Sequence, residues 1–322
     1  MYIQDQIRWD QLDDEILNFY SAIGVDMIHL ELRGGVSTVG AGIGEALRNG
    51  IDCTPQLEQA RAKIEAHGMK LNNVFMSCWR EIPLGLADAD EKIEAWQRML
   101  ESLGRAGIPH LGWNFKPMGN FRTPSDIGAA TSSALSIMLN LRATGPNPIA
   151  RRFLKTKCGA HGEIRQRGHP RGREGGRTHG PTPRRSARAG RWWAQICSTL
   201  AQFRRIFAMH PSQHHAMLFC QGCMTELLGQ GVYAAIAEMA AADKIAWVHF
   251  RNVRGQLPRF AEVFIDEGDI DMRRAMEIYR DNGFNGPYMM DHTPHFPSGR
   301  SDWLGKAYAN GYIRALIQTV YN

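Results

Sequence analysis

The 322-residue chain is poor in cysteine and contains no long hydrophobic run. Its six cysteines are too few for a disulfide framework in a chain of this length, so we expect free thiols or metal ligands and a reducing compartment. Its longest apolar runs, such as Ala216–Cys220, fall far short of the roughly 18 residues that a membrane span needs. The first residues also lack an apolar signal core. These absences predict a cytoplasmic protein that makes no contact with a membrane.

Acidic residues are scarce in one segment only. Residues 142–193 hold 14 Lys and Arg against two acidic residues, whereas the rest of the chain has 24 basic and 30 acidic residues. The segment is crowded with Gly, Pro and Arg and shows no helical or strand periodicity, so we expect an irregular structure over 142–195. Three interpretations stay open: a solvated insertion, a stretch read out of frame from GC-rich codons, and a nucleic-acid-binding arm. The scarcity of aromatic residues argues against the arm.

Elsewhere one unit recurs, in which an amphipathic helix ends at a turn and an apolar strand follows. The turn residues are Gly24, Gly68, Gly107, Asp243 and Gly283. Their spacing, together with a first strand near residues 2–9, predicts eight strands that alternate with helices. We therefore expect one domain over 1–322, a (β/α)₈ TIM barrel of the α/β class whose fifth strand and helix are disrupted or replaced by the irregular segment. A doubly wound open sheet is the alternative, but no Gly-x-Gly-x-x-Gly follows an early strand.

Metal-ligating side chains stand where three of the predicted strands end. The sixth strand ends in Phe-Cys220-Gln-Gly, the seventh in Val-His249-Phe-Arg-Asn, and the eighth in Met-Asp291-His. In such barrels the active site lies at the carboxyl ends of the strands. A thiolate, an imidazole and a carboxylate there would suit Mn²⁺, Fe²⁺ or Zn²⁺. Other interpretations stay open: a hydrogen-bonded structural His249, a turn-capping Asp291, or a redox pair formed by Cys220 and Cys223.

The same strand ends resemble the mannonate dehydratases, a family of the xylose-isomerase-like group of barrels. The similar segments are LFCQGCMTEL, VHFRNVRG, EGDIDMRRAMEIYRDNGFNGPYMMDH and GWNFKPMGNFRT. The resemblance is good over 196–322, loose over 1–125, and absent over 142–195. It implies a lyase that dehydrates a sugar acid, of the D-mannonate to 2-keto-3-deoxy-D-gluconate type.

The resemblance also implies roles for residues. It places one Mn²⁺ or Fe²⁺ ion per chain on Cys220, His249 and Asp291, and it makes His292 an acid/base group. Arg251 would be catalytic, because a cation beside the substrate carboxylate stabilises the enediolate that forms when the C2 proton leaves. A histidine with a pKa near neutrality could then assist the departure of the C3 hydroxyl.

Substrate contacts are implied for Asn114, Arg251 and Asn252. The partner is therefore a small sugar acid, and the sequence leaves open whether the chain forms a homo-oligomer. Two family motifs are missing. The fifth strand's His-Pro-Asp-Asp is absent, with His179 and His210 lying nearest to its place, and so is a Pro-Gly-Tyr-Gly segment after the last strand. His295, Arg300, Asp302 or Tyr308 could take the place of the tyrosine.

Two other functions are compatible with the sequence. The same enediolate can be reprotonated instead of expelling hydroxide, which would make the protein a metal-dependent sugar or sugar-acid isomerase or epimerase. The missing tyrosine favours this alternative. The third function is a catalytically impaired barrel whose basic arm binds polyanions.

Overall fold

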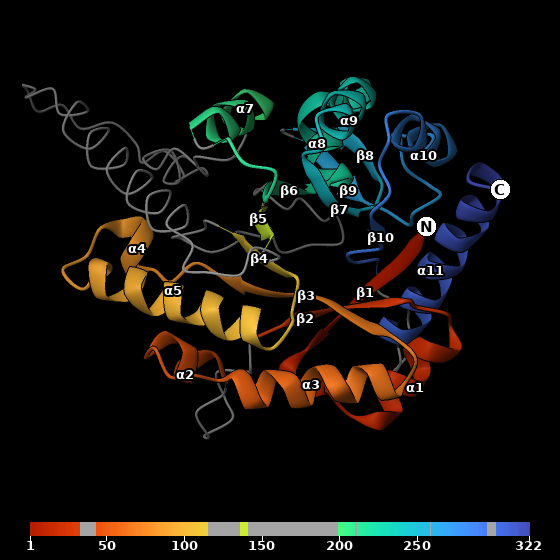
Figure 1. Cartoon of the computed structure of the whole chain (residues 1–322). Helices are drawn as coiled ribbons and strands as arrows, with labels where there is room; N and C mark the ends of the chain where they lie inside the picture. Colours follow the sequence, from red (N-terminus) through yellow and green to blue (C-terminus); the bar gives the residue numbers. More distant parts are fainter. Residues whose placement is uncertain (33–42, 115–135, 141–198, 210, 258, 295–300) are drawn as a thin grey trace, which may run out of the picture.

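Eight strands close a barrel at the centre of the molecule (Figure 1). The structure is a computed structural model, and it describes residues 1–32, 43–114, 136–140, 199–209, 211–257, 259–294 and 301–322. Around the barrel the strands follow the order β1, β10, β7, β6, β5, β4, β3, β2. Their bounds are β1 Tyr2–Arg8, β2 Met27–Glu31, β3 Lys70–Ser77, β4 His110–Asn114, β5 Ser136–Asn140, β6 His215–Cys220, β7 Ile245–His249 and β10 Pro287–Met289.

Helices surround the barrel, and one hairpin is inserted after β7 (Figure 1). The hairpin consists of β8 (Val253–Gln256) and β9 (Arg259–Glu262), which pair antiparallel. The α-helices are α1 Asp14–Ala22, α2 Ile43–Arg48, α3 Thr54–Ala66, α4 Glu81–Leu84, α5 Ala89–Arg105, α7 Leu200–Met209, α8 Gln221–Leu228, α9 Val232–Ala241, α10 Met272–Asp281 and α11 Ser301–Val320. Two 3₁₀ turns, η1 (Trp9–Gln11) and η2 (Gly229–Gly231), complete the described elements. None of these helices has both the length and the hydrophobicity that crossing a membrane requires.

The five predicted turns between helix and strand all have left-handed backbone. Their φ angles are 74° at Gly24, 80° at Gly68, 70° at Gly107, 53° at Asp243 and 83° at Gly283. A left-handed residue ends a helix and redirects the chain, and glycine adopts it without a steric penalty. The repeating unit inferred from the sequence is therefore confirmed at each of these positions.

The fifth strand departs from the expected pattern. β5 lies before the basic segment and runs antiparallel to both of its neighbours, β4 and β6. The barrel is thus closed by seven parallel strands and one antiparallel strand, and the predicted TIM barrel with a departure at its fifth unit is confirmed. The cause is that closure needs only a segment whose backbone can hydrogen-bond on both sides, and residues 136–140 (SIMLN) supply it. Residues 142–195 lie outside the described residues.

The barrel interior is filled by aromatic side chains. The rings of Phe75 and Trp247 lie so close to Gly112 that a Cβ atom there would come within 2.6 Å and 2.8 Å of them. His29 joins this layer, with ring centroids 5.1 Å from Phe75 and 5.6 Å from Trp247. The barrel is therefore a packed core.

The last helix ties the end of the chain to its beginning. In Figure 1, α11 lies along β1. Lys306 Nζ lies 2.5 Å from Asp5 Oδ1, and Asn310 Nδ2 donates to Asp5 Oδ2 at 2.7 Å. Because the Asp5 side chain has no solvent exposure, these contacts compensate a buried charge. They fix α11 against β1. β1 pairs in turn with β10, the strand that precedes Asp291 of the candidate site.

Candidate metal centre

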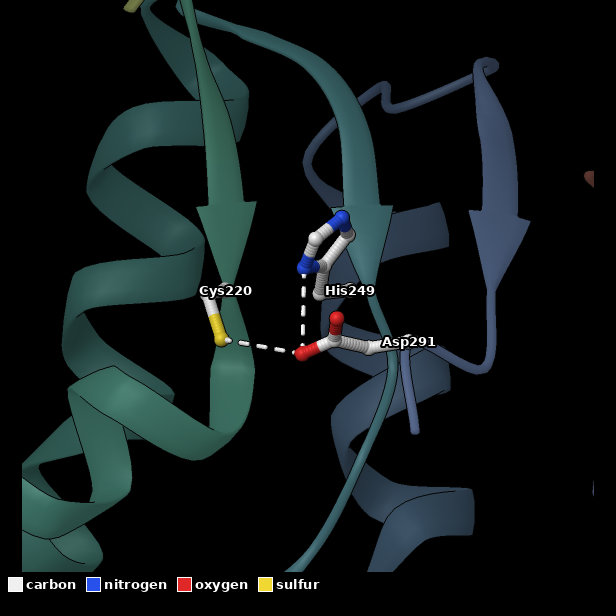
Figure 2. A group of neighbouring side chains, drawn as sticks. All are labelled: Cys220, His249 and Asp291. Carbon is white, nitrogen blue, oxygen red and sulfur yellow. Dashed lines mark hydrogen bonds and ion pairs between the residues drawn. The ribbon is translucent and has the colours of Figure 1, made fainter. Parts of the chain in front are cut away.

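The three predicted metal ligands meet at the rim of the barrel. Cys220 is the last residue of β6, His249 is the last residue of β7, and Asp291 follows β10 by two residues. Their ligand atoms all lie within 4.8 Å of one another. Figure 2 shows the three side chains pointing toward one another from separate strands, with His249 Nδ1 at 3.2 Å and Cys220 Sγ at 4.0 Å from Asp291 Oδ2.

Strand register explains this convergence. Cys220 is the direct partner of His249 in the pairing of β6 with β7, and Met289 is the partner of His249 in the pairing of β10 with β7. Asp291 then has a φ of 67°, a left-handed conformation that Asp tolerates better than most residues. This backbone turn follows a three-residue strand and brings the carboxylate beside its two neighbours.

The electrostatics of the site favour a cation. Burial alone raises the pKa of the Cys220 thiol, but a hydrogen bond from Cys223 and the charge of Arg251 hold that pKa well below its ordinary value. Burial likewise acts against ionisation of Asp291, yet its cationic neighbours, His249 first among them, hold its pKa well below the usual range. Both shifts favour the anionic form of the donor, the form that binds a cation.

His249 completes a donor set that fits a transition metal. Burial opposes protonation of its ring, but the charge of Asp291, with a hydrogen bond to it, raises the pKa of His249 to about 9. The ring must therefore release a proton before it can bind a metal ion. Its Nε2 atom is buried without a hydrogen-bond partner among the described residues. One thiolate, one imidazole and one carboxylate are ligand types that Mn²⁺, Fe²⁺ and Zn²⁺ accept. The residues present thus fit the ion that the resemblance implies.

Arg251 lies behind this cluster, and two of its three guanidinium nitrogens hydrogen-bond to protein groups, whereas Nη1 is buried without a hydrogen-bond partner among the described residues. Its Nε lies 3.1 Å from Asp291 Oδ2, and its Nη2 lies 2.9 Å from Glu226 Oε1 and 3.2 Å from Cys223 Sγ. Its Nη1 is 3.8 Å from Glu262 Oε1, and only 6% of the side chain is exposed. The predicted catalytic and substrate-binding residue is therefore brought to the site, but its guanidinium faces three carboxylates of the protein.

His292 lies at the same rim and is the most exposed of the site's side chains, at 33%. Its Nδ1 lies 3.2 Å from Glu262 Oε2, and its Nε2 lies 3.4 Å from Asp291 Oδ2. The charge of Asp291, opposed by burial and aided by the Glu262 contact, raises the pKa of His292. These contacts therefore favour the protonated imidazole, and a third of the side chain is open to solvent.

The two predicted asparagines are not brought into this cluster. Asn252 is buried, and its carboxamide makes four hydrogen bonds with backbone: Nδ2 donates to Ile265 O and Ile270 O, while Oδ1 accepts from Val253 N and Ile270 N. An amide has no further strong hydrogen bonds to offer. Asn114 ends β4, as predicted, and its buried Oδ1 has no partner among the described residues.

Of the residues near the missing motifs, only Tyr308 has a described side chain. It lies on α11 against Phe264, with ring centroids 5.7 Å apart, and a hydrogen bond with Asp266 raises its pKa to about 12. The positions His179, His210, His295 and Arg300 lie outside the described residues, and so does the side chain of Asp302.

Three residues of the site were missed by the sequence analysis: Cys223 in its present role, Glu226 and Glu262. Glu226 lies on α8, the helix that Cys220 caps, and burial raises its pKa to about 7 while Arg251 acts in the opposite direction. Glu262 lies on β9, in a hairpin that the sequence analysis did not anticipate. The turn residues around Leu257 were the available signal for that hairpin.

Comparison with known proteins locates the similarity in the same part of the chain. The D-mannonate dehydratase (UxuA) family profile matches residues 191–321. A mannonate dehydratase of Lactococcus lactis subsp. lactis is 31% identical over 122 residues, which is 34% of each chain. Mannonate dehydratase 2 of Halalkalibacterium halodurans is 27% identical over 133 residues, or 40% of this chain and 37% of the relative. The chain thus matches only about a third of the length of these relatives.

Solved structures share the fold over a longer stretch. The mannonate dehydratase of Streptococcus suis serotype 2 has a TM-score of 0.66 at 17% identity and covers 99% of this chain and 94% of its own. A xylose isomerase domain protein of Planctomyces limnophilus has a TM-score of 0.58 at 14% identity over all of both chains. At these identities the likeness concerns the fold. The resemblance to the mannonate dehydratases is therefore confirmed in sequence over residues 191–321, and the TIM-barrel fold is shared with these solved structures.

Proposed function

We propose that this protein is a metal-dependent hydro-lyase that removes water from a sugar acid, in a reaction of the D-mannonate to 2-keto-3-deoxy-D-gluconate type. One observation carries the proposal: Cys220, His249 and Asp291 converge at adjacent strand ends, inside the segment that matches the D-mannonate dehydratase family. The curated relatives are named for this reaction. Their similarity over a third of their length supports the activity for this chain.

In this proposal Cys220, His249 and Asp291 hold one divalent ion, Mn²⁺ or Fe²⁺. Three protein ligands are the number typical of catalytic metal sites, which keep a position open, whereas structural sites have four. When bound, such an ion supplies positive charge that stabilises the enediolate formed at C1 and C2 of the sugar acid. The burial of Cys220 and the low solvent access of Asp291 keep competing water away from the donors.

His292 is the proposed acid/base group. The reaction removes a proton from C2 and hydroxide from C3, so one imidazole can accept the C2 proton and then pass it to the departing hydroxide, which leaves as water. A protonated His292, held at Nδ1 by Glu262 and accessible from the rim, can donate that proton. The resulting enol then tautomerises to the 2-keto-3-deoxy product.

The predicted substrate contacts take different roles in this proposal. Asn114 keeps its predicted contact, because its buried Oδ1 has no partner among the described residues at a strand end of the barrel. Arg251 contributes its charge from behind Asp291, since its donors are directed at protein groups. Asn252 fixes the backbone around Ile265 and Ile270, which precedes α10.

The test combines metal analysis with a product screen. Purified protein should contain about one transition-metal ion per chain, and a panel of hexonates should yield a 2-keto-3-deoxy acid from one member. The matched variant is His292→Asn, which should retain the metal and lose turnover. Metal-free protein that stays inactive after Mn²⁺ and Fe²⁺ are added would refute the proposal, and loss of metal in His292→Asn would show that His292 is a ligand.

A second candidate is an isomerase or epimerase that uses the same site. It is favoured by the missing tyrosine segment and by the contacts of Tyr308, which pairs with Asp266 and packs on Phe264. Reprotonation of the enediolate at the opposite face would then replace loss of hydroxide. The hexonate screen separates the two, because an epimer retains the mass of the substrate whereas dehydration lowers it by one water.

A further inference from the structure

We propose that Glu226 is a positioning residue that acts through Arg251 to fix Cys220, His249 and Asp291 in place before a metal ion binds. This inference rests on the proposed metal centre. It concerns a buried ion pair that the sequence analysis did not anticipate, and it assigns Arg251 to the organisation of the ligands.

Arg251 connects the three segments that carry the ligands. It follows His249 by two residues, so its backbone belongs to the end of β7. Its Nε donates to Asp291 Oδ2 at 3.1 Å, beyond β10. Its Nη2 donates to Glu226 Oε1 at 2.9 Å on α8, the helix that Cys220 caps. One rigid guanidinium thus links all three segments, and its planar fork fixes their relative placement.

Glu226 is the counter-charge that makes this link stable. Its side chain is 2% exposed and that of Arg251 is 6% exposed, so both charges are buried. Removing one partner of a buried pair leaves an uncompensated charge, which is strongly destabilising. Asp291 alone could balance Arg251, but a carboxylate that also binds a cation has less charge to share. Glu226 therefore leaves Asp291 available as a ligand.

The chain is shaped to hold the guanidinium at this place. A Cβ atom on Gly222 would come within 2.5 Å of Arg251 Nη1 and 2.6 Å of its Cζ, so a larger residue there would force the arginine side chain to move. Gly222 and Glu226 are four residues apart and therefore lie on one face of α8. Cys223 lies three residues before Glu226 on the same helix, and its Sγ is 3.2 Å from Arg251 Nη2. The same helix face thus provides space, a sulfur and a carboxylate for Arg251.

This arrangement differs from what substrate binding would require. A guanidinium that binds a substrate carboxylate bidentately needs two free donors on one edge. Here Nε and Nη2 bond to protein groups, and Nη1 is buried and 3.8 Å from Glu262 Oε1. Partners of this kind that orient a ligating side chain typically contribute 10–100-fold to metal affinity.

The experiment measures Co²⁺ binding, using the absorption of the cobalt–thiolate bond as the signal. Glu226→Gln keeps the size of the side chain and removes its charge. We expect its dissociation constant for Co²⁺ to rise about 10–100-fold, with a wild-type spectrum at saturation because the ligands are unchanged. At saturating metal, the KM for the sugar acid should stay as in the wild type. Glu238→Gln is the matched control, because it breaks the exposed ion pair with Arg204.

Each outcome decides a different point. Wild-type Co²⁺ affinity in a folded Glu226→Gln protein would overturn the inference and leave the metal centre intact. A raised KM with unchanged Co²⁺ affinity would show that Arg251 acts in substrate binding and does not organise the metal ligands. If Glu226→Gln does not fold, Gly222→Ala tests the same link by displacing the guanidinium, and unchanged affinity there would also overturn it. Failure of the wild type to bind Co²⁺ would instead refute the proposed function.

Discussion

The two halves of the barrel share one hydrophobic core but differ in the residues at which their strands end. In the half before β5, the strands end at Arg8, Glu31, Ser77 and Asn114, and no three His, Cys, Asp or Glu side chains described there cluster as metal ligands do. In the half after β5, three strand ends form such a cluster. The family profile starts at residue 191 and covers this second half only. The barrel geometry is thus shared by both halves, and strand-end residue types decide which half offers a candidate metal site.

The largest effect should come from removing two ligands. We expect His249→Ala/Asp291→Ala to lower metal affinity by more than about 100-fold, because loss of a ligand should exceed the 10–100-fold typical of loss of its hydrogen-bond partner. Equilibrium dialysis followed by metal analysis measures this. The control is Arg273→Ala/Glu277→Ala, which removes an exposed pair on α10. Full metal occupancy in the ligand variant would show that chemistry is not located in the second half.

The next prediction concerns the first half. Trp96 is fully buried on α5 and packs edge-to-face on Trp79 and Trp113, with ring centroids 5.1 Å and 5.9 Å away. Trp96→Ala should lower the free energy of unfolding by about 3–5 kcal/mol, because it leaves a large cavity. Urea unfolding measures the loss, and the protein that remains folded should bind metal with wild-type affinity.

A counterpart in the second half sharpens the contrast. Tyr279 on α10 is fully buried, and its ring lies 6.0 Å from Phe219 and 6.4 Å from Phe250, which adjoin Cys220 and His249 in sequence. Tyr279→Ala should cost a similar amount of stability. In contrast to Trp96→Ala, it should also weaken metal binding, because it loosens two ligand-bearing strands. Equal metal affinity in the two variants would contradict the division of roles.

The sequence predicted the elements whose signals are local. Left-handed turns at Gly24 and Gly283 follow from residue type and from the end of a helical pattern. The metal ligands could be predicted because parallel strands place their ends at one rim, so Cys220, His249 and Asp291 needed only correct strand limits.

The rest depended on contacts that no local pattern encodes. The direction of β5 is set by its pairing with β4 and β6. The five residues of β5 carry no pattern that distinguishes a parallel from an antiparallel strand. Arg251 was placed correctly at a strand end, but its interpretation as a substrate contact required knowing where its guanidinium points. Glu226 reaches it from another element across 25 positions of sequence. Charge pairs of this kind become visible only in the folded chain.

The link between the halves provides the next prediction. Lys306 joins α11 to Asp5 on β1, and removing it leaves a carboxylate without solvent exposure. Lys306→Met should lower the free energy of unfolding by about 3 kcal/mol, the lower end of the range for a broken buried pair, because the lysine is partly exposed. Adding Asp5→Asn should restore part of the loss. Urea unfolding of both variants gives the comparison, and equal stability of the single and double variants would mean that the charge is compensated elsewhere.

The smallest effects test whether the two halves unfold together. Asp13 caps α1 in the first half by accepting a hydrogen bond from Ile16 N at 2.9 Å, and Asp271 caps α10 in the second by accepting one from Arg274 N at 3.0 Å. Asp13→Ala and Asp271→Ala should each cost about 1 kcal/mol, whereas the corresponding Asn variants should be close to wild type. Because β1 pairs with both β2 and β10, we expect each Ala variant to shift one shared unfolding transition by the same amount. Two transitions in urea, with each variant moving only one, would show that the antiparallel β5 joins halves that fold separately.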